Sequence, residues 1–392
     1  MKTLSSAAAA ALLACIGLAC TGSARAETQG VSDDAIVIGT ISDLSGPLAS
    51  GGAPNVQGLR LRIDEANAAG GVHGRQIDLR VEDMKYDLTL AVRATNKLVK
   101  RDEIFAMISS VGTPTTMAAQ KILDPQGVPT LFPVTAARSV VEPLSPLHFS
   151  LYVNYQNQAA GALKHFVAET GAKKVCLQAV ANDYGQEVVD GFEATSEAMG
   201  LEVVFHGSHK VTETDFAGSA TAIKNSGCEL LVLGTTTKDT INLYSTLRKL
   251  GWDKPVVGNM VPYTAIVAEA GDGATEGLYL VSPFRAADYT DGDAFRTDFA
   301  ARFEEKYGAR PEPYGELGYV AGDLLVKALE TAGRELTVET LTRAIESISH
   351  YDDPFGGPGY GFSAEKHAGG SGLVLVQAQS RKWVVVESNL PF

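Results

Sequence analysis

Hydroxyl-bearing side chains cluster in one loop, directly after the apolar run Phe105 to Ile108. The loop reads Ser109-Ser110-Val111-Gly112-Thr113-Pro114-Thr115-Thr116 and leads into an Ala-rich helical pattern. Hydroxyls and unpaired backbone N–H groups at the start of a helix form an uncharged anion site, which suits a carboxylate without any arginine. The alternative is that Thr113 or Thr115 only caps the helix, which is at least as common.

Residues that could carry out catalysis or hold a metal are scarce. The seven histidines include no His-x-x-x-His or His-Glu pair, so a metal site has little support. The loop Gly39-Thr40-Ile41-Ser42-Asp43 lacks the second glycine of a dinucleotide-binding loop. No phosphate-binding Gly-Lys-Ser/Thr loop or Gly-x-Ser-x-Gly turn lies between a strand and a helix. We therefore expect a binding protein without cofactor or metal, and keep an enzyme as the minor alternative.

Strand-like apolar runs alternate with helical patterns along the chain, which predicts the α/β class with parallel sheets. Strands are expected at 36–41, 77–82, 105–108, 130–132, 174–180, 202–207, 230–233, 256–258, 277–281, 374–377 and 383–386. Helices are expected, among others, at 56–68, 88–100, 159–169, 185–199, 216–225, 239–250 and 294–307. A chain of 392 residues exceeds what one core usually holds, so two domains are expected.

The first such unit has the most specific sequence. The strand Ile36 to Ile41 is followed by Ser45-Gly46-Pro47, a helix, the turn Asn67-Ala68-Ala69-Gly70-Gly71-Val72-His73-Gly74, and a second strand. This order strongly resembles the leucine/isoleucine/valine-binding protein family, the soluble receptors of ATP-binding-cassette (ABC) importers. The resemblance covers nearly all of the chain after residue 26.

The resemblance implies two Rossmann-like lobes joined by a three-segment hinge, the periplasmic binding protein type I fold. Boundary signals near 151–154, 282–284 and 353–361 divide the chain accordingly. Residues 27–150 and 284–350 would form the N-lobe, and residues 151–283 and 351–392 the C-lobe. Three connectors suit closure of the lobes around a ligand.

The resemblance also places the ligand site in loops that follow the strands. Two N-lobe loops would hold the ligand carboxylate, and they contain Gly112, Thr113, Val134, Thr135 and Ala136. From the C-lobe, Asn182-Asp183-Tyr184-Gly185 resembles the family's Tyr-Gly step, whose aromatic ring closes over the ligand. Other expected wall residues are Gly51, Tyr86, Tyr155, Thr236, Met260 and Tyr319. For each tyrosine, ordinary packing is the alternative.

Two positions depart from the pattern of amino-acid receptors, which need carboxylates to hold the ligand's ammonium group. Met260 and Tyr155 stand where the family typically supplies those carboxylates, and Gly51 stands where a tyrosine often contacts the ligand. An apolar side chain and a phenol cannot neutralise a buried ammonium, whereas aromatic rings and a thioether pack well on an aromatic ligand. These features favour a small hydrophobic carboxylate, and an aromatic acid fits best. This interpretation depends on matching the loops of this chain to those of the family, and the alternative matching places Asp183 or Glu316 nearer the ligand.

We therefore expect a monomeric receptor that captures such an acid by lobe closure and passes it to an ABC permease in the inner membrane. Alternatives are a receptor for branched-chain amino acids or amides, and a receptor that reports to a membrane sensor. The formal charge of −13 and the absence of a Lys/Arg run exclude an electrostatic site for nucleic acid.

The N-terminus has the features of an export signal. Lys2 precedes an apolar, Ala-rich run from Ala7 to Ala19, and Ala24-Arg25-Ala26 predicts cleavage before Glu27, so residues 1–26 are read as a signal peptide. This predicts a periplasmic location; a lipoprotein signal at Cys15 or Cys20 and an N-terminal anchor helix are alternatives.

Only Cys176 and Cys228 follow the signal peptide. Both lie beside predicted strands, and we expect two buried free thiols rather than a disulfide.

Overall fold

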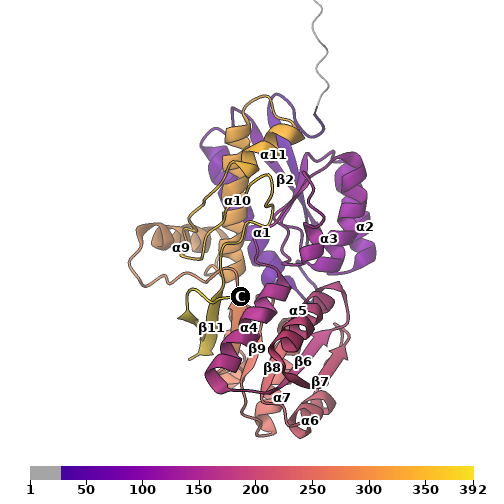
Figure 1. Cartoon of the computed structure of the whole chain (residues 1–392). Coiled ribbons are helices and arrows are strands. Elements are labelled where there is room, and N and C mark those ends of the chain that lie inside the picture. The colour runs from indigo at the N-terminus through magenta and orange to yellow at the C-terminus, as the bar shows by residue number, and fades with distance from the viewer. Residues whose placement is uncertain (1–27) are drawn as a thin grey trace, which may run out of the picture.

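The apolar runs expected as strands form two separate sheets, one in each of two lobes (Figure 1). This computed structural model describes residues 28–392. The predicted signal peptide, its cleavage site, Cys15 and Cys20 lie outside the described residues. The α/β class is confirmed, because parallel strands alternate with helices through most of both lobes.

The first lobe is built on a five-stranded parallel sheet of order β2-β1-β3-β4-β5. Its strands are β1 (Ala35–Ser42), β2 (Gln76–Asp83), β3 (Ala106–Ile108), β4 (Thr130–Leu131) and β5 (His148–Phe149). The helices between them are α1 (Ala49–Ala68), α2 (Leu88–Lys100) and α3 (Thr113–Leu123). Three later helices also join this lobe, namely α9 (Ala294–Tyr307), α10 (Pro313–Ala332) and α11 (Val338–Glu346).

The second lobe is built on a seven-stranded sheet of order β12-β11-β10-β9-β8-β6-β7. Parallel strands are β6 (Lys174–Val180), β7 (Glu202–His209), β8 (Leu230–Gly234), β9 (Val256–Gly258) and β10 (Tyr279–Ser282), and β11 (Val374–Gln379) and β12 (Lys382–Glu387) are antiparallel. Its helices are α4 (Tyr155–Thr170), α5 (Asp183–Met199), α6 (Ala217–Asn225), α7 (Thr237–Lys249) and the short α8 (Ala265–Ala268).

Side-chain caps fix where several helices begin. Asn154 accepts a hydrogen bond from the Asn157 N–H at the start of α4, and Asn182 accepts one from the Gly185 N–H at the start of α5. Such caps satisfy donors that have no partner within the helix. Because both helices start where the second lobe faces the first, the caps fix the backbone at that boundary.

Helix α10 packs unusually closely on α1. A Cβ atom on Gly58 would lie 1.8 Å from the carbonyl oxygen of Gly315, and one on Gly318 would lie 1.9 Å from that of Asn55. Only glycine allows this approach, since any side chain would collide with backbone. The packing brings the first turns of α1 and α10 to the same place between the lobes.

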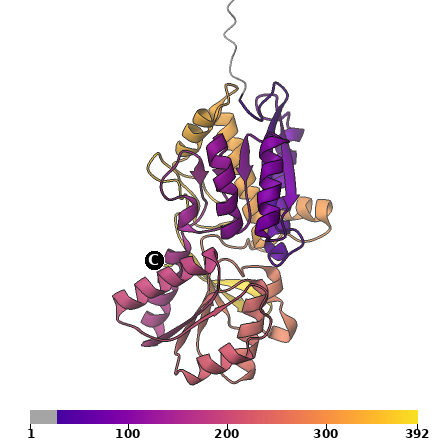
Figure 2. The same ribbon diagram turned by 90° about the vertical axis from the view of Figure 1, so that its right-hand side faces the viewer.

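Connections between the lobes lie side by side where the two lobes meet (Figure 2). Residues 351–369, expected in the second lobe, pack on the first. Ala368 pairs with Ser150 in a β-bridge, and the ring of Phe362 lies 5.7 Å from that of Phe132. The chain therefore enters the second sheet at β11, later than the expected boundary at residue 351.

Two elements of the first lobe differ from expectation. Helix α1 begins at Ala49 rather than Val56, although Gly51, Gly52 and Pro54 are poor helix formers. Strand β5 was not expected, because two residues give no periodic signal. In both cases tertiary packing overrides weak local preference.

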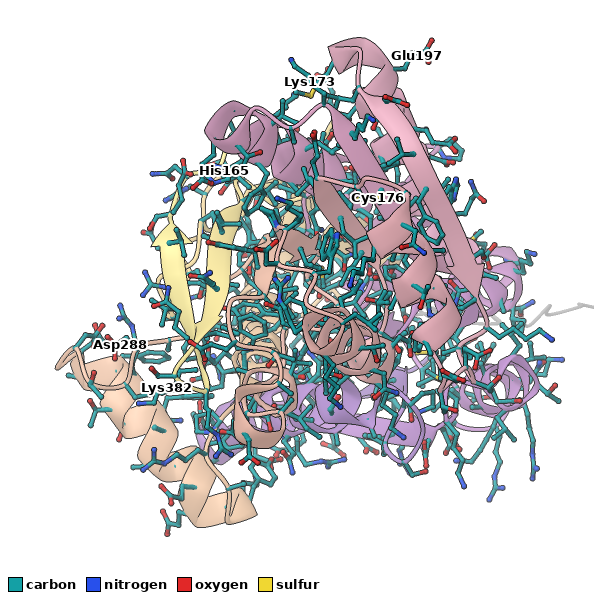
Figure 3. All side chains as sticks on the ribbon, turned by 90° about the horizontal axis from the view of Figure 1, so that it is seen from below. His165, Lys173, Cys176, Glu197, Asp288 and Lys382 are labelled. Carbon is teal, nitrogen blue, oxygen red and sulfur yellow. A yellow bond between two sulfur atoms is a disulfide. The ribbon has the colours of Figure 1, made fainter. Side chains whose placement is uncertain are left out.

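The expectation of two free thiols is wrong, because Cys176 and Cys228 form a disulfide with their Cα atoms 5.9 Å apart. Cys176 lies in β6, and Cys228 lies two residues before β8, the strand that pairs with β6. The pairing of these strands, which spacing alone did not give, brings the two sulfurs together. Figure 3 labels Cys176 within the second lobe, whereas Lys173 and Glu197 are exposed.

Within residues 28–392, no helix is both long and apolar enough to cross a membrane.

Candidate functional site

A cavity lies between the two lobes and encloses about 500 Å³ of space free of protein atoms, part of it open to solvent. Both lobes contribute to its wall. The fifteen lining residues are Leu48, Gly51, Gly52, Tyr86, Val111, Gly112, Thr113, Val134, Tyr155, Tyr184, Thr236, Thr237, Met260, Val261 and Tyr314.

Six helices begin at this cavity, namely α1, α3, α4, α5, α7 and α10. Each supplies lining residues from its N-cap or first four positions, such as Thr113 in α3, Thr237 in α7 and Tyr314 in α10. The N-terminus of a helix carries a partial positive charge and N–H groups without an intrahelical acceptor. Convergence of six such ends makes the cavity electrically favourable for an anion and unfavourable for a cation.

Among the described residues that line the cavity, none carries a charged side chain. The nearby buried carboxylates are already engaged. Asp43 accepts hydrogen bonds from the N–H groups of Gly46 and Leu48, and Asp239 accepts one from the Thr236 N–H. A ligand cation would therefore find no neutralising carboxylate in the wall.

The two carboxylates that the sequence left open both lie outside the wall. Asp183 is exposed in the first turn of α5. Glu316 is buried on α10 and accepts hydrogen bonds from the Ala287 N–H at 2.9 Å and the Tyr289 hydroxyl at 2.6 Å. Burial raises the pKa of Glu316 to about 7, and those two hydrogen bonds oppose the rise.

A hydroxyl cluster occupies the first-lobe side of the cavity. The Thr113 and Thr135 hydroxyl oxygens lie 2.6 Å apart, and Thr135 also accepts a hydrogen bond from the Ala137 N–H at 3.2 Å. Burial raises the pKa of Tyr155 to about 12, while interactions with the Ala136 N–H and the Thr135 side chain oppose the rise. Thr135 and Ala136 thus lie behind the wall and support Thr113 and Tyr155. The lining groups Thr113 and Tyr155 can donate hydrogen bonds to a carboxylate.

Aromatic rings form much of the remaining wall. The ring centroids of Tyr155 and Tyr184 are 4.9 Å apart in an edge-to-face arrangement, and the Tyr184 hydroxyl donates to the Thr235 carbonyl. Tyr86 has a positive φ of 55° and packs over Gly112, where a Cβ atom would lie 2.4 Å from the Tyr86 ring. Residues held in this backbone region cluster at functional sites. The arrangement suits a flat or apolar ligand body.

Met260 is held firmly at the second-lobe side. Its N–H donates to the Gln158 side chain at 3.1 Å, and its carbonyl accepts from the Tyr314 hydroxyl at 2.9 Å. The Tyr314 ring also covers Gly51, where a Cβ atom would lie 3.2 Å from the ring. The space that Gly51 was expected to leave for a ligand is thus occupied by Tyr314.

Direct hydrogen bonds join the lobes around the cavity. Ser50 and Thr237 hydroxyl oxygens lie 3.3 Å apart, and the Asn182 side chain donates to the Tyr86 hydroxyl at 3.2 Å. Each pair has one residue in each lobe. The structure is therefore a closed arrangement of the two lobes.

Nine of the twelve residues expected at the site line this cavity. Thr135 and Ala136 support it from behind, and Tyr319 lies elsewhere. Tyr319 packs on Phe299 with ring centroids 5.0 Å apart and donates to Glu65. Tyr314 precedes Tyr319 on α10 by more than one turn, so the two rings point in different directions and only Tyr314 faces the cavity.

Six lining residues were not among the twelve expected, namely Leu48, Gly52, Val111, Thr237, Val261 and Tyr314, although the loops of Thr237 and Val261 were expected to line the cleft. Five of them are next to an expected residue or in an expected loop. Tyr314 gave no local signal, because it follows the Pro-rich stretch that ends at Pro313. Within residues 28–392, no cluster of three or more His, Cys, Asp or Glu side chains could hold a metal ion.

Comparison with known proteins identifies the class and then the family. The periplasmic binding protein model matches residues 35–382. The chain belongs to the Leu/Ile/Val-binding family of type I periplasmic binding proteins, which are solute-binding proteins of ABC transporters and not enzymes.

Individual relatives differ in their described ligands. The chain is 25% identical over 331 residues to a leucine-, isoleucine-, valine-, threonine- and alanine-binding protein of Pseudomonas aeruginosa, covering 83% of this chain and 86% of the relative. A fatty acid ABC transporter substrate-binding protein from Thermomonospora curvata matches with TM-score 0.83 and 22% identity over 93% of this chain and 95% of that one. A solute-binding protein of R. palustris in complex with benzoate matches with TM-score 0.80 and 21% identity, over 91% of this chain and 97% of that one.

Proposed function

We propose that this protein captures a small hydrophobic monocarboxylate, with aromatic acids as the favoured class, and delivers it to an ABC permease. The observation that carries the proposal is the charge pattern of the cavity: six helix N-termini converge on it and its described wall has no charged side chain. This environment stabilises one negative charge and offers nothing to a positive one.

The ligand body is assigned from the shape and chemistry of the wall. Tyr86, Tyr155, Tyr184, Tyr314 and Met260 supply apolar surface on several sides. Aromatic rings and a thioether pack favourably on an aromatic or branched hydrocarbon. The related proteins described with benzoate and with fatty acid support a carboxylate without an amine.

The mechanism is capture followed by closure. The carboxylate docks on Thr113 of the first lobe. The second lobe then closes over the ligand, bringing the Tyr155 hydroxyl to the carboxylate and Tyr184 and Met260 to the ligand body. The cross-lobe hydrogen bonds of Ser50 and Asn182 stabilise the closed form. A periplasmic location, with residues 1–26 removed as a signal peptide, is part of this proposal.

Branched-chain amino acids are the second candidate, because the Pseudomonas relative is described as binding them. Isothermal titration calorimetry with benzoate, 4-hydroxybenzoate, leucine and valine separates the two. The proposal expects binding of at least one aromatic acid and weak or no binding of the amino acids. Tight leucine or valine binding without binding of any acid would contradict it. Mass spectrometry of the compound that co-purifies with the exported protein provides an independent identification.

A further inference from the structure

Two hydroxyl-bearing side chains from opposite lobes face each other beside the ligand cavity. Ser50 lies in the first turn of α1 in the first lobe, next to the lining residue Gly51. Thr237 is the first residue of α7 in the second lobe and lines the cavity itself. Their hydroxyl oxygens lie 3.3 Å apart. Hydrogen bonds between hydroxyl groups are usually about 2.5–3.0 Å long, so this contact is a weak one.

The pair has a hydrogen-bond donor to spare. Each hydroxyl carries one proton, and a contact between two hydroxyls uses only one of the two protons. Within residues 28–392, neither the Ser50 nor the Thr237 hydroxyl makes any other hydrogen bond. Thr237 is 4% exposed, and a buried donor without an acceptor is unfavourable. With Ser50 donating to Thr237, the Thr237 proton is available to a ligand group in the cavity.

The ligand group that accepts this proton should be uncharged. The start of α7 already has a buried carboxylate, because Asp239 is 1% exposed and accepts a hydrogen bond from the Thr236 N–H at 3.1 Å. A second anionic group of the ligand would be repelled by it. A cationic group would meet the six helix N-termini that converge on the cavity. A hydroxyl or carbonyl oxygen avoids both penalties and accepts the hydrogen bond.

This donor belongs to a different part of the wall from the hydroxyls assigned to the ligand carboxylate. Thr113 follows β3 and pairs with Thr135, which follows β4. Ser50 and Thr237 instead follow β1 and β8, and neither hydrogen-bonds to Thr113 or Thr135. A ligand that reaches both places therefore carries an oxygen apart from its carboxylate.

We propose that Thr237, oriented by Ser50, is a specificity-determining residue that selects acids with a hydroxyl or carbonyl group in addition to the carboxylate. The inference rests on the proposed function, since it takes a carboxylate in this cavity as given, and it narrows the ligand class to oxygen-substituted acids. One hydrogen bond of this kind changes affinity by about twofold to tenfold. Because Ser50 and Thr237 belong to different lobes, the oriented donor exists only in the closed arrangement.

Isothermal titration calorimetry with benzoate, 3-hydroxybenzoate and 4-hydroxybenzoate measures this selection. We expect at least one hydroxybenzoate to bind the wild type about threefold or more tightly than benzoate does. Thr237→Val replaces the hydroxyl by a methyl group of nearly the same shape and should bring this affinity ratio close to one. Thr237→Ser keeps a hydroxyl and should keep the preference. Thr221→Val makes the same exchange on an exposed residue of α6 and should keep the wild-type ratio.

The outcomes separate this inference from the proposed function. Benzoate binding at least as tightly as both hydroxybenzoates, or a preference that survives in Thr237→Val, overturns the selection and leaves the ligand class intact. If Thr237→Val fails to fold in urea-unfolding measurements, Thr237→Ala carries the same expectation and the same refutation.

Absence of binding by all three aromatic acids contradicts the favoured class of the proposed function. Hexanoate and 6-hydroxyhexanoate then test the selection, with the same expected ratio in the wild type and the same loss in Thr237→Val. Equal affinity for these two acids, or no binding of either, overturns the inference as well.

Discussion

Met260 offers the sharpest test of how the cavity selects its ligand. Met260 lines the cavity and is 1% exposed. Its backbone N–H donates to the side chain of Gln158 in the second lobe, and its carbonyl accepts from the hydroxyl of Tyr314 in the first lobe. A substituted side chain at this position should therefore stay directed into the same space. The substitution Met260→Glu places a carboxylate in a wall that otherwise lacks charge.

The expected change in affinity is large and has opposite signs for two ligand classes. Two unit charges about 4 Å apart interact by about 4 kcal/mol at an effective dielectric constant of about 20. Desolvation of the new carboxylate opposes part of this energy. We expect a net shift of about 1.4–3 kcal/mol, which is about tenfold to a hundredfold in Kd. Benzoate should bind more weakly and leucine more tightly than in the wild type.

Isothermal titration of both ligands to the wild type, Met260→Glu and Met260→Gln measures these shifts. Met260→Gln is the control, because it has nearly the shape of the glutamate without its charge, and it should change the benzoate-to-leucine ratio far less. Equal benzoate affinity in Met260→Glu and Met260→Gln would show that Met260 does not face the ligand. That result would refute the charge argument for the site.

Three further substitutions test the architecture around the cavity. Gly112→Ala should weaken ligand binding at least tenfold and lower stability by about 1–3 kcal/mol, measured by calorimetry and urea unfolding, because it adds a clash to a positive φ of 88°. Loss of the Cys176–Cys228 disulfide, by reduction or by Cys228→Ala, should lower the unfolding free energy by about 4 kcal/mol for a separation of 52 residues, measured by urea unfolding. Asn182→Ala should cost about 1 kcal/mol in stability as a lost helix cap, and should weaken ligand binding in addition because its cross-lobe hydrogen bond is lost.

Matched controls make these outcomes specific. Gly127→Ala also sits at positive φ, 68°, but has open space around it, so it should lose stability without the additional loss of binding. Asp293→Ala removes the side-chain cap of α9, a helix that supplies no lining residue, and should leave affinity nearly unchanged. If Gly112→Ala binds like Gly127→Ala, or Asn182→Ala like Asp293→Ala, the cavity wall or the closure contact is misassigned. A denaturation midpoint that does not move on reduction would contradict the stabilising role of the disulfide.

Local sequence signals located most elements of the fold. Helices α2 and α9 begin and end at the predicted residues, and strand β6 was predicted at its observed bounds. Their apolar periodicity, caps and terminal glycines are all local features. The turn at Gly70-Gly71 and the strands around it carried the family resemblance for the same reason.

Features set by tertiary packing escaped prediction. Tyr314 reaches the cavity because glycines let α10 press against α1, which no local pattern encodes. The disulfide depends on which strands become neighbours in the sheet. Residues 351–369 return to the first lobe through aromatic packing of Phe362 that the Gly/Pro-rich sequence does not indicate. Loop residues of the site were predicted better than wall residues on distant helices, because loops after parallel strands meet at one edge.

Leucine and 4-methylpentanoate differ only by the α-amino group, so their relative affinity measures directly what the cavity does with a cation. Competitive calorimetry of the two ligands on the wild-type protein, repeated with phenylalanine and 3-phenylpropanoate, gives that difference. The account predicts that the acid without the amine binds more tightly in at least one pair and that neither amino acid is preferred. Tighter binding of leucine or phenylalanine than of its deaminated counterpart would contradict the central claim.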